Sequence, residues 1–309
     1  IALPGGCAIG SRPVNYHLKA LEKLGVNILL KNGYIEARTD KLVGANIEFE
    51  GVTVTGTENL IMAASLAKGV SILTNVAKEP EILDLANFLN SMGAKISGAG
   101  TDKIIVEGVE ELSGTTYEIP ADRIEAGTYL IAGAVTNGNI TINKIDPERM
   151  GAIIENLKKA GAEVISNGKS ISLNMTNHIL KPVNIITAPF PGFPTDMQAQ
   201  FTVLNCMGQG ESRVKETIFE NRFMHIQELN RMGTKNRIDG TTAIINGVDS
   251  ISGAQVMATD LRASASLIIA GLVAKGETIV DRIYHIDRGY ERIEEKLSNL
   301  GAEILRLPN

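Results

Sequence analysis

The sequence predicts a mixed α/β (α+β) fold built from repeated β-α-β-α-β-β units. A helix ending of the form Leu-x-x-x-Gly recurs five times, hairpin turns follow four of the copies, and strongly apolar segments precede four of them. Self-similarity at one period indicates a fold assembled from one supersecondary unit. The repeated glycines stand 68, 68, 72 and 68 residues apart, at positions 25, 93, 161, 233 and 301.

Each repeated glycine is expected to end an amphipathic helix. Ile82, Leu85 and Leu89 follow the helical period, and so do Ile293 and Leu297. A glycine just past the last apolar position favours the left-handed helix stop. The hairpins that follow are predicted at residues 32–33, 98–100, 167–168 and 239–240.

The other helix of each unit is expected to be buried. Four segments are apolar on nearly every side, and each ends at a turn that contains glycine and continues into a β-branched strand. We therefore expect interior helices at residues 60–67, 129–135, 199–207 and 263–274.

The two ends of the chain do not complete the repeat. Residues 1–37 contain only the second half of a unit, and residues 302–309 are expected to form one strand with no partner. The chain therefore reads as truncated relative to its own repeat. We place a domain boundary near residue 119, after a strand and turn region at 108–118. Residues 1–119 form a partial first domain, and 120–309 form a second domain of three units.

The composition limits the function. The net charge of −5 argues against nucleic-acid binding, and the longest apolar runs are too short to cross a bilayer. Two cysteines form no disulfide framework and no zinc pattern, so a reducing, cytoplasmic setting is expected, with no metal. Cys206 is expected in the core, and His225 and His285 are expected to be hydrogen-bonded structural groups and not metal ligands.

A loop at residues 4–13 contains three glycines, two prolines, Cys7 and Arg12. A thiol near cationic groups ionises more readily than a free one, so Cys7 is a candidate reactive cysteine. The alternative is a surface turn with an incidental cysteine.

Polar and acidic residues recur where the buried helices begin. Threonine and aspartate are preferred helix caps, so capping is the simpler interpretation for most of them. Asp196 differs because the proline-rich loop 189–194 precedes it and suits a positioned general base.

Four arginines lie at comparable junctions beside helices, and together they would suit a small anionic substrate. Each taken alone is more simply a solvated surface charge. They are Arg12, Arg222, Arg262 and Arg288.

Several long motifs resemble the UDP-N-acetylglucosamine enolpyruvyl transferase family, and the resemblance runs from end to end of the chain. The motifs are residues 4–14, 193–200, 220–225, 252–264 and 281–292. The resemblance implies two domains, each an inverse α/β barrel with buried helices inside and sheets outside. It implies transfer of the enolpyruvyl group of phosphoenolpyruvate to the 3-hydroxyl of UDP-N-acetylglucosamine, the first committed step of peptidoglycan synthesis, without a cofactor. The oligomeric state stays open.

The resemblance also implies residue roles. Cys7 matches the proton donor to C3 of phosphoenolpyruvate, which forms a covalent phospholactoyl adduct and is the target of fosfomycin. Asp196 matches the residue that takes the proton of the sugar hydroxyl. Arg12 and Arg288 match positions that hold anionic groups, and Arg222, Arg262 and Asp260 belong to the same wall. The UDP-sugar contacts match Arg12, Pro13, Val14, Asn15, Tyr16, Thr55, Gly56 and Ile218.

The chain departs from the family at two points. Asn15 stands where many relatives have aspartate, and about a hundred residues at the start, with further substrate contacts, are expected to be missing. Two alternatives remain: a shikimate 3-phosphate enolpyruvyl transferase, which Cys7 argues against, and a non-catalytic sugar-nucleotide binder or fragment.

Overall fold

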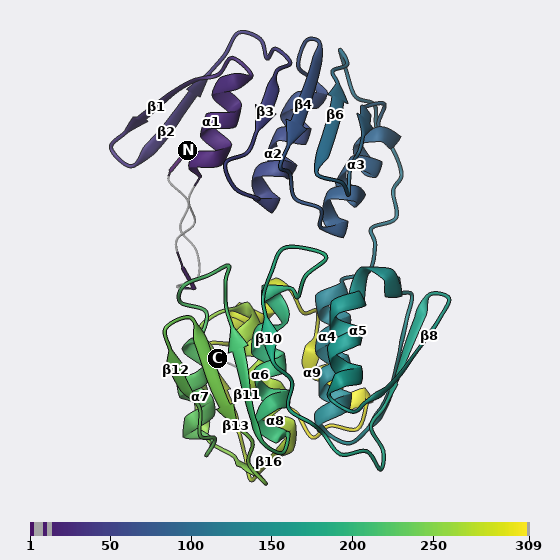
Figure 1. Cartoon of the computed structure of the whole chain (residues 1–309), viewed down its shortest axis with the longest axis vertical. Helices are drawn as coiled ribbons and strands as arrows, with labels where there is room; N and C mark the ends of the chain where they lie inside the picture. Colours follow the sequence, from purple (N-terminus) through teal and green to yellow (C-terminus); the bar gives the residue numbers. More distant parts are fainter. Residues whose placement is uncertain (3–8, 11–13, 308–309) are drawn as a thin grey trace. The chain divides into compact units, whose positions relative to one another are not determined.

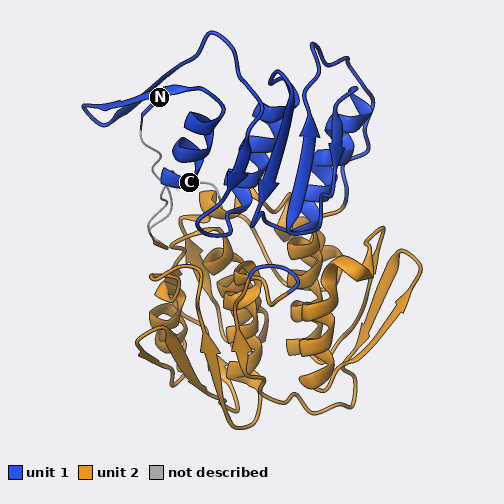
Figure 2. Cartoon of the chain, turned by 45° about the horizontal axis from the view of Figure 1, so that its top comes forward, with its two compact units in different colours: residues 1–6, 12–120, 189–191 blue, residues 7–11, 121–188, 192–309 orange. Residues whose placement is uncertain are grey.

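A computed structural model describes residues 1–2, 9–10 and 14–307 of the chain. These residues divide into two compact units, coloured separately in Figure 2. Unit 1 contains the described residues 1–2, 14–120 and 189–191, and unit 2 contains 9–10, 121–188 and 192–307. Each unit has an apolar core of its own, centred on residues such as Leu60 and Leu73 in unit 1 and Leu130 and Phe201 in unit 2.

Unit 1 begins with a helix and a hairpin and continues with one complete repeat. The helix and hairpin are α1 (Asn15–Lys23), β1 (Asn27–Lys31) and β2 (Tyr34–Arg38). The repeat is β3 (Asn46–Glu48), α2 (Val54–Ser65), β4 (Val70–Thr74), α3 (Pro80–Ser91), β5 (Lys95–Ser97) and β6 (Lys103–Glu107). Its strands form one sheet in the order β3-β4-β6-β5, in which β3 and β4 are parallel and the other pairs antiparallel. The predicted β-α-β-α-β-β unit is confirmed.

Unit 2 contains three further copies. The first is α4 (Arg123–Val135), β7 (Asn139–Asn143), η1 (Pro147–Met150), α5 (Gly151–Lys159), β8 (Glu163–Asn167) and β9 (Ser170–Asn174). The second is β10 (Ile185–Ile186), η2 (Thr195–Met197), α6 (Gln198–Met207), β11 (Glu211–Lys215), α7 (Met224–Arg231), β12 (Arg237–Asp239) and β13 (Thr242–Asn246). The third is β14 (Ile251–Ser252), β15 (Gln255–Met257), α8 (Leu261–Val273), β16 (Ala274–Lys275), β17 (Ile279–Asp281), η3 (Ile283–Arg288) and α9 (Ile293–Asn299).

The second copy of unit 2 repeats the strand order of unit 1, since its sheet runs β10-β11-β13-β12 with β10 and β11 parallel. The parallel pair matters for the site, because both strands end at the same edge of the sheet. The first copy forms the sheet β7-β9-β8, and the third pairs β14 with β16 and β15 with β17. Two expected strands do not form: residues 108–118 and 302–307 carry no strand. At 108–118 the chain is held mainly by isolated backbone bonds, such as those from Val109 to Ser65 and from Ser113 to Met92.

The expected interior helices are confirmed in unit 2. Helices α4, α6 and α8 pack against one another, and every residue of α6 except its last is buried. Figure 1 shows α6 behind strands β10 and β11, so the helices lie inside and the sheets outside. In unit 1 the expectation holds for only part of α2, because Met62 keeps 47% of its surface exposed. No helix among the described residues combines the length and apolarity that a membrane span needs.

The five repeated glycines have the predicted conformation. Each ends its helix with φ between 91° and 103°, in the left-handed region that side chains with a Cβ rarely adopt. Two hairpins turn one residue later than predicted, because Asn167 still pairs with Ser170 and Asp239 with Thr242.

Candidate functional site

Three predicted residues of unit 2 meet at one point. Arg222 donates from Nη2 to Oδ1 of Asp196 at 2.6 Å, and Arg262 donates from Nη2 to Oδ2 of the same carboxylate at 3.2 Å. The side chain of Asp196 is 39% exposed, whereas those of Arg222 and Arg262 are 6% and 12% exposed. The aspartate is therefore accessible on one side and held by guanidinium groups on the other.

The charge of Asp196 follows from these contacts. Burial alone would raise the pKa of this carboxyl group, but the positive charges of Arg262 and Arg222 and their hydrogen bonds outweigh it. The pKa of Asp196 therefore lies below its ordinary value, and the group is a carboxylate at neutral pH. A carboxylate in this state can accept a proton.

Arg262 is positioned by the start of α8 and by a tyrosine. Asp260 is the N-cap of α8, and its carboxylate accepts from the backbone N–H groups of Arg262 at 2.9 Å and Ala263 at 3.1 Å. The guanidinium donates from Nη1 to the hydroxyl of Tyr290 at 3.2 Å and lies over that ring, 5.6 Å from its centre. Tyr290 is 1% exposed, and its hydroxyl also contacts Thr128 Oγ1 at 2.9 Å. These contacts therefore hold the guanidinium group of Arg262 in one orientation, towards Asp196.

Arg222 is positioned from another side. It donates from Nη1 to Thr195 Oγ1 at 2.8 Å and lies over the ring of Phe219, 5.2 Å from its centre. Thr195 in turn donates to Oε2 of Glu216 at 2.8 Å. Glu216 is 2% exposed and directly follows β11.

Asp196 does not act as a helix cap, which separates it from the other acidic helix starts. Asp122 caps α4 and Asp260 caps α8, as the simpler interpretation predicts. Helix α2 is capped by a threonine, Thr53, whose side chain accepts from the N–H of Gly56. The side chain of Asp196 makes only its two guanidinium contacts among the interactions of the described residues.

The expectation for Cys206 is confirmed, because this residue is buried, and burial raises the pKa of its thiol to about 11. His225 is a buried residue of α7, but its Nε2 has no hydrogen-bond partner among the described residues, so the expected hydrogen-bonded role holds only in part. Burial lowers the pKa of His225 to about 4, although the charge of Asp260 acts in the opposite direction. Among the described residues no group of His, Cys, Asp or Glu side chains is arranged to hold a metal ion.

In unit 1, the predicted sugar-nucleotide residues lie at the starts of two helices. Val14, Asn15 and Tyr16 begin α1, and Thr55 and Gly56 lie in the first turn of α2. A hydrogen bond of 3.1 Å between His17 Nε2 and Thr55 Oγ1 joins the two helix starts. Gly51 packs so closely on the ring of Tyr16 that a Cβ there would lie 2.9 Å from its hydroxyl oxygen. The structure therefore brings these five residues together.

The remaining predicted residues have different outcomes. Cys7, Arg12 and Pro13 lie outside the described residues. Nearby, Ile9 accepts a backbone hydrogen bond from Asn221 at 2.9 Å, one residue before Arg222. Ile218 is 39% exposed, and its N–H donates to Oε1 of Glu216 at 2.8 Å. Arg288 is an exposed residue that ends η3, two positions before Tyr290.

The sequence did not single out the residues that hold the two arginines. Thr195 and Tyr290 stand inside quoted motifs, but their side chains carried no separate signal there. Glu216 follows a strand of ordinary alternation, and only the fold reveals that its carboxylate is buried among donors. A buried acid with several hydrogen-bond partners is not recognisable from neighbouring residues alone.

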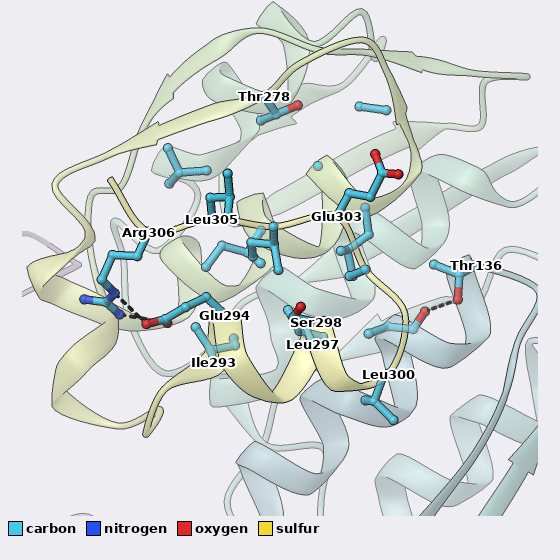
Figure 3. A pocket seen from close by; sticks show the side chains of 18 of the residues that line it. Thr136, Thr278, Ile293, Glu294, Leu297, Ser298, Leu300, Glu303, Leu305 and Arg306 are labelled. Carbon is cyan, nitrogen blue, oxygen red and sulfur yellow. Dashed lines mark hydrogen bonds and ion pairs between the residues drawn. The ribbon is translucent and has the colours of Figure 1, made fainter. Parts of the chain in front are cut away.

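Unit 2 also contains a large hollow away from Asp196. It has a volume of about 1720 Å³ and runs along α9 and residues 302–307, as Figure 3 shows. Apolar side chains such as Ile293, Leu297 and Leu305 line it, beside an ion pair of 2.7 Å between Arg306 and Glu294. Neither Asp196 nor its two arginines contributes to this hollow.

Comparison with known proteins gives three findings. A sequence model of the EPSP synthase (3-phosphoshikimate 1-carboxyvinyltransferase) family matches residues 1–297. The chain is 60% identical over 306 residues to the UDP-N-acetylglucosamine 1-carboxyvinyltransferase of Hydrogenovibrio crunogenus, covering 99% of this chain and 73% of that protein. Solved structures of related transferases are similar in fold.

The enolpyruvyl transferase NikO from Streptomyces tendae superimposes with a TM-score of 0.87 at 23% identity, over 96% of this chain and 72% of that one. An EPSP synthase from Acinetobacter baumannii gives 0.71 at 20% identity over the same shares. At these identities the structures establish the fold alone.

Proposed function

The chain belongs to the EPSP synthase family of carboxyvinyl transferases, and we propose that it transfers the enolpyruvyl group of phosphoenolpyruvate to the 3-hydroxyl of UDP-N-acetylglucosamine, with release of phosphate. The observation that carries this proposal is the 60% identity over nearly the whole chain to a transferase named for that sugar nucleotide. The product would enter the synthesis of peptidoglycan in the cytoplasm, and with it growth, shape and division of the cell.

Asp196 is the proposed base. Its carboxylate is ionised, half-exposed and fixed by two hydrogen bonds, which suits a group that takes a proton from a bound hydroxyl. A strongly paired carboxylate is a weak base, however, so the pairing has to weaken during the reaction.

The substrate itself supplies that change. Arg222 and Arg262, with Arg12 and Arg288, are the proposed contacts of the phosphate and carboxylate groups, with Asp260 beside Arg262. Guanidinium groups bind such anions by paired hydrogen bonds. An anion that shares Arg222 and Arg262 with Asp196 partly neutralises them, so the pKa of Asp196 rises and its basicity increases as the substrate binds.

Cys7 is the proposed proton donor to C3 of phosphoenolpyruvate and the site of the covalent adduct. The proposed sugar-nucleotide contacts are Arg12, Pro13, Val14, Asn15, Tyr16, Thr55, Gly56 and Ile218. The junction between α1 and α2 in unit 1 supports five of them, because one hydrogen bond joins the two helix starts there.

Phosphate release by the full-length protein tests the proposal. We expect release from phosphoenolpyruvate only when UDP-N-acetylglucosamine is present, and its loss in Cys7→Ser and Asp196→Ala. Fosfomycin should add its mass to Cys7 and leave Cys206 unmodified, because that thiol is buried with a pKa of about 11.

The same assay separates the alternatives. Release that depends on shikimate 3-phosphate would identify the chain as a transferase of that substrate instead. Binding of the sugar nucleotide without any release would favour a non-catalytic binder. Full release by Cys7→Ala would contradict the role of Cys7.

A further inference from the structure

Glu216 collects hydrogen bonds from both segments that carry the site residues of unit 2. Its Oε2 accepts from Thr195 Oγ1 at 2.8 Å, on the segment of Asp196. Its Oε1 accepts from the N–H groups of Ile218 at 2.8 Å and Phe219 at 3.3 Å, on the segment that leads to Arg222. A fourth donor, the hydroxyl of Thr187, lies 2.8 Å from Oε1.

The sheet brings these groups together. Strands β10 and β11 are parallel, so Thr187 and Glu216 leave the same edge side by side. Thr187 also accepts from the N–H of Thr217 at 2.8 Å, and its own N–H donates to Lys215 at 3.0 Å. Glu216 therefore stands on a rigid edge, whereas the residues it holds belong to loops and short turns.

The number of hydrogens on each group determines which group donates and which accepts. Thr195 has one hydroxyl hydrogen and gives it to Glu216, so its oxygen accepts from Arg222 Nη1. Arg222 then turns its Nη2 to Asp196. Hydrogen bonds therefore connect Glu216, Thr195, Arg222 and Asp196 in that order, and Thr195 and Asp196 are also neighbours in sequence.

We propose that Glu216 is a positioning residue, which aims Arg222 at Asp196 through Thr195 and holds the Ile218 segment through its other carboxylate oxygen. The kinetic consequences rest on the proposed transfer reaction. The bond from Thr195 to Oε2 of Glu216 supports Asp196, and the bonds to Oε1 support Ile218, a proposed sugar-nucleotide contact. Loss of either set of bonds should therefore have a separate kinetic effect.

Glu216→Gln keeps the shape of the side chain but replaces one carboxylate oxygen by an NH2 group. This NH2 group is a hydrogen-bond donor, and it would face donors that the carboxylate oxygen now accepts from. We expect kcat to fall about ten- to a hundredfold and the KM for UDP-N-acetylglucosamine to rise about fivefold, since small misplacements cost that much in positioned sites. Thr195→Val removes only the hydroxyl that links Glu216 to Arg222. We therefore expect kcat to fall about tenfold, while the KM for UDP-N-acetylglucosamine changes less than about twofold. Thr195→Ser retains the hydroxyl and most of the activity. Glu211→Gln, on the exposed start of the same strand, is the control and leaves both parameters unchanged.

The double variant decides whether Glu216 acts through Thr195. We expect Glu216→Gln with Thr195→Val to lose no more kcat than Glu216→Gln alone, since both changes break one chain. Losses that multiply, or wild-type kcat and KM in Glu216→Gln, would overturn the proposal. If the unaltered protein shows no turnover, the proposed function has failed. The positioning role is then decided by urea unfolding midpoints, where non-additive shifts of the two variants support it and additive shifts overturn it.

Discussion

At the scale of single residues, the ion pairs of Asp196 and the base role proposed for it make opposite demands on the carboxylate. A carboxylate with two guanidinium partners is stable as an anion, and a general base has to accept a proton. The exposed side of the group resolves this, because a substrate can approach there and compete for the same arginines. The position of Asp196 outside the helix cap is what leaves that side open.

The first prediction concerns this carboxylate. Asp196→Asn keeps the shape and removes the proton acceptor, so kcat for phosphate release should fall about a hundredfold or more. Steady-state kinetics of the full-length protein measure it. Asp249→Asn, at an exposed loop position of the same unit, is the matched control and should leave kcat unchanged. Equal rates for both variants would contradict the assignment of Asp196.

The second prediction concerns Tyr290. Tyr290→Phe removes the buried hydroxyl that accepts from Arg262 and contacts Thr128, which leaves polar groups unpaired. We expect the free energy of unfolding to fall by about 1–3 kcal/mol. Urea denaturation measures the loss. Tyr284→Phe alters a tyrosine that is 59% exposed and should cost almost nothing. A similar midpoint for the two variants would contradict the argument.

The third prediction concerns pH. The pKa of His225 is lowered to about 4 by burial, while in the unfolded chain it is near 6.5. The unfolded state therefore binds more protons between these values, and the free energy of unfolding decreases as pH falls from 6.5 towards 4. His225→Gln should flatten this slope in urea titrations, and His178→Gln, at an exposed position, should not. An unchanged slope in His225→Gln would show that other groups cause the pH dependence.

At the scale of elements, the N-terminus of α8 has two tasks. Asp260 caps the helix and also fixes the backbone of Arg262. Asp122 caps α4 through the N–H groups of Ile124 and Glu125. The cap of α8 therefore places the backbone of Arg262 directly, which the cap of α4 does not do.

The fourth prediction uses this difference. Asp260→Ala should lower the free energy of unfolding by about 1 kcal/mol through loss of the cap, and it should also lower kcat because Arg262 moves. Asp260→Asn retains a good capping group and should restore most of the stability. Asp146→Ala removes the cap of the short helix η1 and should affect stability only. If Asp146→Ala lowered kcat as much as Asp260→Ala, the link between the cap and Arg262 would be wrong.

The elements themselves were largely predictable, because they depend on local rules. Glycines such as Gly93 and Gly233 end helices in the left-handed conformation that their position predicts. The strand expected at residues 108–118 does not form, because a strand needs a pairing partner that the local sequence does not reveal. The arrangement around Glu216 was not predictable, since its four donors come from positions 187, 195, 218 and 219, which meet only after the sheet forms.

At the scale of the whole molecule, the two units have separate apolar cores. The fifth prediction is that residues 121–309 fold without unit 1. This fragment retains α4, α6 and α8 and the contacts of Asp196 with both arginines. We expect a single cooperative transition in thermal denaturation, followed by circular dichroism. A broad, non-cooperative transition would show that its core depends on residues before 121, such as the buried Ile9.

The surroundings of Asp196 also determine the fate of the proton it would remove. Its two partners are guanidinium groups, which hold their protons at every physiological pH and cannot pass one on. Among the described residues, hydrogen bonds lead from Asp196 to Thr195 and Glu216 only through Arg222, so the buried carboxylate of Glu216 would be no acceptor for this proton. In the proposed reaction the proton would therefore leave Asp196 on its solvent-facing side, to water or to a departing product group, and each turnover would restore the carboxylate through that side.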